Sequence, residues 1–144
     1  MGSSKFSFVL FVDRALGRSA VPSALKLTGA NVEIHMDHFA PDAPDIEWLS
    51  KVAESGWVVL TKDKNIGRNY LELRAVAQFK IRMFVLVSGN LTRQQMADTF
   101  VKDFPKMNNF CIGNKPPFIA KIYSSGKIQM WKDCVEIMKQ FPNT

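Results

Sequence analysis

Three aspartates, Asp13, Asp45 and Asp63, stand far apart in the sequence at positions where parallel sheets do their chemistry. Asp13 ends the nearly all-apolar run 6–12, and Asp63 closely follows the unbroken apolar run 57–60, which is followed by Thr61. Apolar runs of this length are typical of strands buried on both faces, and open α/β sheets bind ligands beyond the carboxyl ends of such strands. If the two strands are neighbours, about 4.8 Å apart, both acids face one small volume.

The third acid, Asp45, opens a helix expected from about Pro44 to Ser55 and closed by Gly56. At 100° per residue the helix has an apolar stripe with Trp48 at its margin, made of Ile46, Leu49, Val52 and Ala53. Asp45 lies near the centre of that stripe, so we expect it to face the sheet, whereas Glu47 faces water. The alternative is a structural role, with Asp42 as the N-cap and Asp45 at the third helical position.

Three carboxylates that share a pocket repel one another unless a cation neutralises them. Oxygen ligands with retained water suit Mg²⁺ or Mn²⁺, and such a site can activate water for attack on a phosphodiester. The chain is basic, with a net charge of +6 and a pI near 9.5. Five basic residues near the expected pocket could hold the phosphates of a nucleic acid: Arg14, Arg18, Lys62, Lys64 and Arg68.

Strand and helix patterns alternate along most of the chain, which predicts βαβ units and a mostly parallel sheet flanked by helices. Strands are expected at 6–12, 32–36, 57–61 and 83–87, and helices at 19–28, 44–55 and 71–79. Thr92 and Gln95 form a capping box that opens a further helix, which buries Met96, Ala97, Phe100, Val101 and Phe104. Residues 108–117 are expected to be irregular. Strands at 118–123 and 127–131 form a C-terminal β-hairpin, followed by a short helix at 134–141.

These segments are similar to the PIN-like proteins of the VapC45-type toxin group. The similarity rests on Phe-Val-Asp13-Arg-Ala-Leu-Gly, on Asp-His-Phe-Ala-Pro-Asp-Ala-Pro-Asp45-Ile-Glu-Trp-Leu and on Val-Val-Leu-Thr-Lys-Asp63-Lys. The segments 84–92 and 117–123 fit the same group. The resemblance implies a PIN-like domain over residues 1–132, with 133–144 as a tail or short helix. It further implies a Mg²⁺- or Mn²⁺-dependent endoribonuclease that hydrolyses RNA with metal-activated water, and the toxin half of a toxin–antitoxin pair.

The resemblance assigns the metal-binding and catalytic roles to Asp13, Asp45 and Asp63. Many PIN proteins carry a further acid shortly after the last of these, but Asn65 stands two residues beyond Asp63 in this chain. Asn65 could hold a metal-bound water, and Asp42 or Glu47 could replace the missing acid. Thr61 could orient a carboxylate or a water through its hydroxyl.

The remaining polar and aromatic residues carry weaker signals. His35 and His38 are expected at the surface or in a turn, because no cysteine or third histidine accompanies them as zinc ligands. Tyr123 and Trp131 could stack on bases, although packing of the hairpin is the simpler expectation. Cys111 and Cys134 match neither a disulfide framework nor a zinc motif.

The sequence predicts neither a membrane span nor a signal peptide, so we expect a cytoplasmic protein. The expected partners are RNA and a cognate antitoxin, and a homodimer is left open. Two other classes of protein compete with the nuclease. One is a non-catalytic PIN-like module that binds RNA or a protein. The other is a phospho-receiver domain, which the sequence around Asp13 disfavours, because receivers carry paired acids after the first strand.

Overall fold

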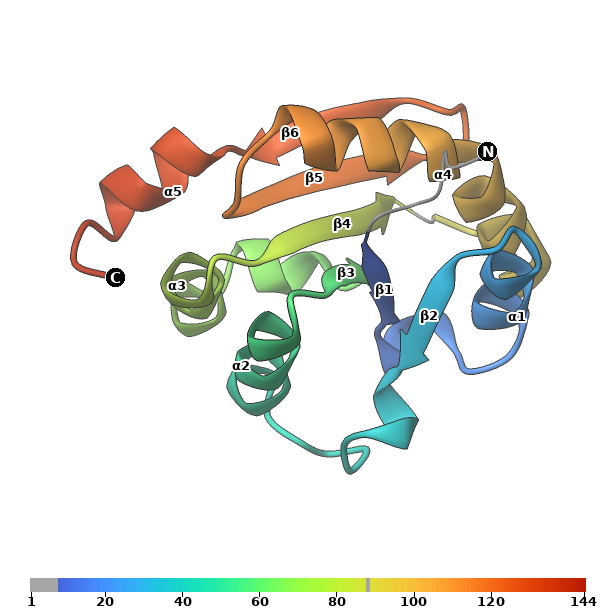
Figure 1. Cartoon of the computed structure of the whole chain (residues 1–144), viewed down its shortest axis with the longest axis horizontal. Coiled ribbons are helices and arrows are strands. Elements are labelled where there is room, and N and C mark those ends of the chain that lie inside the picture. Colours follow the sequence, from blue (N-terminus) through green and yellow to red (C-terminus); the bar gives the residue numbers. More distant parts are fainter. Residues whose placement is uncertain (1–7, 88) are drawn as a thin grey trace.

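The apolar runs form one six-stranded sheet with helices on both faces (Figure 1). The computed structural model describes residues 8–87 and 89–144. The strands are β1 (Val9–Val12), β2 (Asn31–Ile34), β3 (Val58–Thr61), β4 (Arg82–Val87), β5 (Phe118–Tyr123) and β6 (Ile128–Lys132). The α-helices are α1 (Ala20–Leu27), α2 (Asp45–Ser55), α3 (Tyr70–Phe79), α4 (Arg93–Gly113) and α5 (Cys134–Gln140). Short 3₁₀ helices are η1 (Arg14–Leu16), η2 (His35–Asp37) and η3 (Lys64–Gly67).

The strands follow the order β2-β1-β3-β4-β5-β6 across the sheet. The pairs from β2 to β5 are parallel, and β5 pairs with β6 in the antiparallel direction. The α/β fold, with its C-terminal hairpin, is therefore confirmed. The neighbouring position of β1 and β3 is also confirmed, so that the carboxyl ends of these two strands meet at one edge.

Alternate side chains of each strand enter two separate cores. One core lies beneath α1 and α4 and contains Leu10, Leu60 and Phe100. The other lies beneath α2, α3 and α5 and contains Phe11, Val59 and Ile137. Burial on both faces explains why the central strands are nearly continuous apolar runs.

The second strand is shorter than its alternating pattern predicts. It ends at Ile34, the partner of Val12 at the end of β1, and His35 and Met36 lie in η2. Because β2 is an edge strand that pairs with β1 alone, the end of β1 leaves the next residues without a backbone partner. The expected strand at 32–36 was therefore too long.

The fourth helix opens at the expected capping box, where Thr92 and Gln95 each accept a backbone N–H of the other. It continues to Gly113, so the irregular segment expected from residue 108 was wrong up to that point. Met107 and Cys111 are buried four residues apart in the first core, and the Phe110 ring packs edge-on to Phe84 and Phe118. This burial holds the helix together beyond Pro105.

None of the helices in the described ranges is both long and apolar enough to cross a membrane.

Candidate active site

The two strand-end aspartates are joined through the hydroxyl of Thr61. Thr61 Oγ1 donates to Asp13 Oδ2 at 2.8 Å and accepts the backbone N–H of Asp63 at 3.1 Å. Asp63 Oδ1 in turn accepts the backbone N–H of Asn65 at 2.9 Å and thereby caps η3. Asp13 is only 6% exposed, which is costly for a carboxylate unless it is paired or hydrogen-bonded. The Thr61 hydroxyl therefore holds the Asp13 carboxylate and the backbone of Asp63 in place.

Asp45 is the first residue of α2 and follows an N-cap at Pro44, which has no side-chain cap. The capping role considered for Asp42 and Asp45 is therefore wrong. Asp45 is half-buried, and its Oδ1 accepts the indole N–H of Trp48 at 2.8 Å. Asp42 and Glu47 are exposed, so the contrast between an inward Asp45 and an outward Glu47 is confirmed.

The helix is rotated relative to the predicted stripe. Trp48 is 1% exposed and stacks on the Phe11 ring at 5.4 Å, whereas Ile46, expected inside, is 44% exposed. The large indole and its hydrogen bond to Asp45 outweigh the burial of one isoleucine. The same rotation brings the Asp45 carboxylate to the sheet.

A fourth acid, Glu72, completes the group and was missed by sequence reasoning. Glu72 lies in the first turn of α3, where Asn69 caps the helix. Burial, a hydrogen bond shared with Asp45, and the charges of Asp45 and Asp63 raise its pKa to about 8. Its Oε2 atom is buried without a partner among the described residues. The available signal was its position four residues before the buried Val76, on the inward side of the helix.

Electrostatic coupling links all four carboxylates into what we call the acidic cluster: Asp13, Asp45, Asp63 and Glu72. Burial raises the pKa of Asp13, and the charge of Asp45 adds to this, while the Thr61 hydroxyl opposes it. Asp45 thus interacts with Asp13 on one side and with Glu72 on the other, and Glu72 also interacts with Asp63. These interactions link the ends of β1 and β3 with the first turns of α2 and α3.

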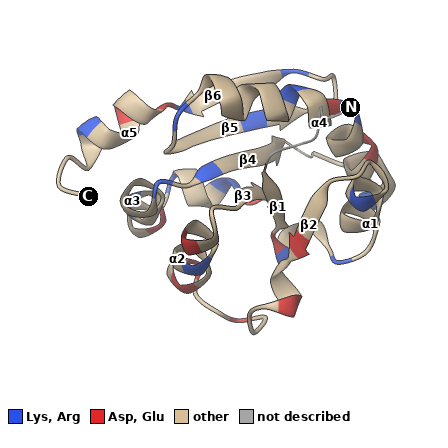
Figure 2. Ribbon diagram, in the orientation of Figure 1, with Lys and Arg blue, Asp and Glu red and all other residues tan. Residues whose placement is uncertain are grey.

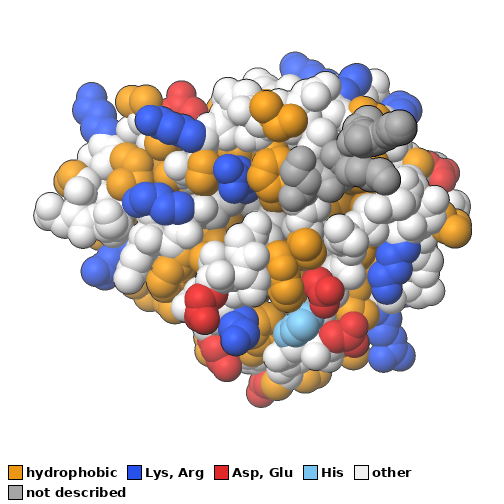
Figure 3. All heavy atoms as spheres, in the orientation of Figure 1, with side chains coloured by type: hydrophobic (Ala, Val, Ile, Leu, Met, Phe, Trp, Pro, Cys, Tyr) orange, Lys and Arg blue, Asp and Glu red, His pale blue; other side chains and the backbone are white. Residues whose placement is uncertain are grey.

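The two histidines have different environments. His38 is close to the surface, and its Nε2 lies 2.7 Å from Glu33 Oε1. Figure 3 shows a histidine side chain at the surface beside acidic side chains. His35 is only 1% exposed and packs among the rings of Phe11, Phe39 and Trp48, so the expected surface position was wrong. Burial lowers its pKa, although Asp13 and Asp45 oppose this shift.

The five basic residues proposed for phosphate contacts are all exposed: Arg14, Arg18, Lys62, Lys64 and Arg68. Arg14 follows Asp13 directly, and Lys62 and Lys64 flank Asp63. They therefore lie on the chain segments that carry the acids and leave their charged ends open to a ligand.

The carboxylate oxygens of the acidic cluster repel one another, and they are suitable ligands for a hard divalent cation. Burial above all, together with the neighbouring carboxylates of Asp45 and Asp63, raises the pKa of Glu72 and drives it toward its protonated form. In residues 8–87 and 89–144, however, no three His, Cys, Asp or Glu side chains are already arranged to hold one ion. The Asp45 carboxylate accepts the indole N–H of Trp48 and the Asp63 carboxylate accepts the backbone N–H of Asn65, so both would have to change these hydrogen bonds to coordinate a shared cation.

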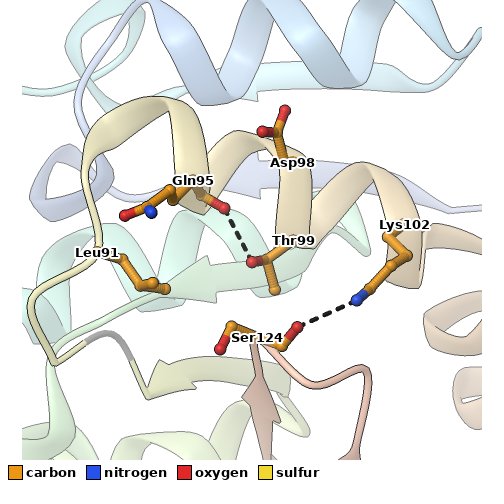
Figure 4. Close-up of a pocket in the computed structure, with 6 residues that line it drawn as sticks. All are labelled: Leu91, Gln95, Asp98, Thr99, Lys102 and Ser124. Atoms are coloured by element: carbon orange, nitrogen blue, oxygen red, sulfur yellow. Dashed lines mark hydrogen bonds between the residues drawn. The ribbon is translucent and has the colours of Figure 1, made fainter.

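A polar hollow of about 280 Å³, away from the acidic cluster, lies between α4 and the β5–β6 turn (Figure 4). Thr99 donates to the Gln95 carbonyl, and Lys102 donates to the Ser124 carbonyl at 3.1 Å. Asp98 is the carboxylate in its lining, so this hollow lacks the set of acids that a metal site requires. The hydrogen bond from Lys102 holds the hairpin turn against α4.

Comparison with known proteins agrees with the fold. A family model described as a PIN-like domain matches residues 8–88, and the chain belongs to this family. The chain is also 32% identical over 96 residues to "Putative ribonuclease VapC45" from Mycobacterium tuberculosis, which covers 64% of this chain and 70% of that protein. No solved structure matches the chain significantly. Family membership sets aside the phospho-receiver hypothesis.

Proposed function

We propose that this PIN-like protein is a Mg²⁺- or Mn²⁺-dependent endoribonuclease. The observation that carries the proposal is the electrostatic interaction among four carboxylates, in which burial first and the neighbouring Asp45 and Asp63 second raise the pKa of Glu72 to about 8. A group of mutually repelling acids is unfavourable for the fold by itself, and a bound divalent cation would remove the repulsion. The similarity to a protein named as a ribonuclease supports RNA as the substrate.

In this proposal Asp13, Asp45 and Asp63 hold the metal, and Glu72 supplies the fourth anionic group. Thr61 keeps Asp13 turned toward the cluster through its hydrogen bond of 2.8 Å. The exposed lysines and arginines around Asp13 and Asp63 bind the RNA backbone through its phosphates. When bound, Mg²⁺ or Mn²⁺ would supply Lewis-acid activation of a water for attack on the phosphodiester. The expected products carry a 5′-phosphate and a 3′-hydroxyl.

We further propose that the protein acts in the cytoplasm as the toxin of a toxin–antitoxin pair. An RNA-degrading activity would harm its own cell, so a cognate antitoxin is the expected partner. The neighbouring reading frame is the cheapest test. Co-expression of its product should relieve growth arrest caused by this chain, and arrest that no neighbouring product relieves would contradict the pairing.

Two variants on α2 provide a matched test of the nuclease. Asp45→Asn removes a charge from the cluster, whereas Glu47→Gln removes one from an exposed position two residues away. With Mn²⁺ and a labelled RNA, Asp45→Asn should lower the cleavage rate at least 100-fold, an estimate based on the loss of a charged metal ligand. It should also abolish the rise in melting temperature caused by Mn²⁺. Glu47→Gln should behave as the wild type.

The proposal is wrong if purified wild-type protein with Mn²⁺ cuts no RNA and Asp45→Asn leaves the thermal response to Mn²⁺ unchanged.

One observation favours a second candidate, a non-catalytic PIN-like module that binds RNA. No three candidate ligands in the described ranges are already arranged around one ion. RNA binding that persists without cleavage, over a wide range of Mg²⁺ and Mn²⁺ concentrations, would favour this second function.

A further inference from the structure

The hairpin carries a row of lysine, aromatic and amide side chains on one face of the sheet. Along β5, Phe118, Ala120 and Ile122 enter the first core. Lys121 and Tyr123 therefore point to the opposite face, and neither is fully buried. On β6, Gln129 pairs with Lys121, and its exposed side chain lies on the same face. Lys127 pairs with Tyr123 through a backbone bond of 3.0 Å. We call Lys121, Tyr123, Lys127 and Gln129 the hairpin face.

The hairpin face lies on the same side of the sheet as Thr61, the residue that holds Asp13. Thr61 is in register with Val85, Val85 with Lys121, and Lys121 with Gln129. All of these side chains lie on the face that α2 and α3 cover further along the sheet. Lys121 is thus two strand spacings, about 10 Å, from the residue that holds Asp13. One extended chain can contact both places.

Contacts within the hairpin keep its ligand-binding groups oriented. The Lys121 ammonium lies 4.4 Å from the centre of the Trp131 ring, and Trp131 packs on Gly67 of η3, close to Asp63. The Tyr123 hydroxyl lies 3.2 Å from Gln129 Oε1, and the Lys127 ammonium lies 5.8 Å from the Tyr123 ring. A partly exposed tyrosine ring with one lysine beside it and a second lysine two residues away on the same strand face is suited to an aromatic base and its neighbouring phosphates.

The distribution of charge selects an anionic ligand for this half of the molecule. Figure 2 shows basic residues on β5 and at the ends of β6, residues of both signs on α4, and acidic residues gathered on α2 and near the end of β2. A neutral or basic protein surface would gain little from Lys121 and Lys127. A polyanion that ends at the acidic cluster would be held by both lysines and positioned for the metal.

We propose that the hairpin face binds a single-stranded segment of the RNA, with one unpaired base stacked on Tyr123 and adjacent phosphates contacted by Lys121 and Lys127. This inference rests on the proposed function, and it defines the substrate as RNA that is unpaired beside the cleavage site. In a duplex the faces of each base are stacked on the neighbouring base pairs, so the bases cannot stack on the tyrosine ring.

The test measures RNA binding in EDTA, so that it does not depend on the metal or on cleavage. Fluorescence anisotropy with a labelled oligouridine reports affinity at several salt concentrations. Tyr123→Ala should weaken binding about 5- to 100-fold, the loss expected for one stacked base, and Tyr123→Phe should retain affinity. Lys121→Met keeps an unbranched chain over Trp131 and should reduce the salt slope by about 0.7, the value for one phosphate contact on a single strand. A perfect duplex should bind more weakly and should not respond to Tyr123→Ala.

Lys26→Met is the matched control, because Lys26 is exposed on α1, which covers the opposite face. All variants should keep the wild-type melting temperature and its response to Mn²⁺, which shows that the fold and the acidic cluster are intact. Wild-type affinity and salt slope in both Tyr123→Ala and Lys121→Met would overturn the proposal. So would a change of oligomeric state with RNA binding unaltered, since the face would then contact protein. Failure of the wild type to bind any RNA would instead contradict the proposed function itself.

Discussion

Thr61 donates its hydroxyl hydrogen to Asp13 across the β1–β3 pair, with 2.8 Å between Thr61 Oγ1 and Asp13 Oδ2. The two residues are 48 positions apart, and both are at least nine-tenths buried. The bond offsets part of the burial that raises the pKa of Asp13. A residue with no charge of its own thereby controls how readily the deepest acid of the cluster ionises.

Thr61→Val should impair metal binding without removing a candidate ligand. The variant keeps the shape of the side chain, but Asp13 loses its hydroxyl partner, and its pKa rises further. We expect Mn²⁺ affinity or cleavage to fall about 10- to 100-fold, as for other residues that orient metal ligands. The pH at which Mn²⁺ binding is half-maximal should move upward, because a proton competes for Asp13 over a wider range. Thr61→Ser, which keeps the hydroxyl, should remain close to the wild type, and equal effects of the two variants would contradict this role.

Glu72 should make the metal-free protein less stable as the pH rises. Its pKa is raised from 4.5 to about 8 in the folded protein, so between these values the folded state holds a proton that the unfolded state has lost. The stabilisation is therefore full near pH 4.5 and is lost as the pH rises through 8. Urea unfolding in EDTA at pH 5.5 and pH 8 measures the effect. Glu72→Gln should flatten this dependence, and parallel pH profiles of variant and wild type would exclude the coupling of Glu72 with Asp45 and Asp63.

Gly67→Ala should destabilise the fold through the hairpin. A Cβ atom at Gly67 would lie 2.5 Å from the Trp131 ring, and a rigid indole in a packed position yields little. We expect a loss of about 1–3 kcal/mol in the free energy of unfolding, the range for overpacking. Gly113→Ala at the end of α4 is the control, because nothing in the described ranges lies within 4 Å of its added atom. Urea unfolding of both variants gives the comparison. Trp131→Leu should recover part of the loss in the Gly67→Ala background, and strict additivity of the two changes would show that the contact is unimportant.

The sequence by itself determined those features that depend on local pattern. The apolar runs gave the strands, and the acids that follow them lie at the sheet edge because a parallel strand has a defined carboxyl end. The 3.6-residue period was sufficient to separate Asp45 from Glu47, since neighbours on a helix two positions apart face different ways. The capping box at Thr92 and Gln95 was equally local, because its two hydrogen bonds lie within one turn.

The tertiary structure alone decided the features that depend on which surfaces meet. Glu72 became the fourth acid because α3 packs beside α2, and no spacing in the chain encodes that contact. Trp48, and not Ile46, is buried because its ring stacks on the ring of Phe11, which lies on β1. His35 was buried because η2 folds over that same ring. The α4 helix continues beyond the residues whose local pattern predicts a helix, because Met107 and Cys111 are buried in a core formed by distant strands. Burial is a property of the assembled fold, so it can override local preference and bring together groups whose sequence separation carries no information about their distance.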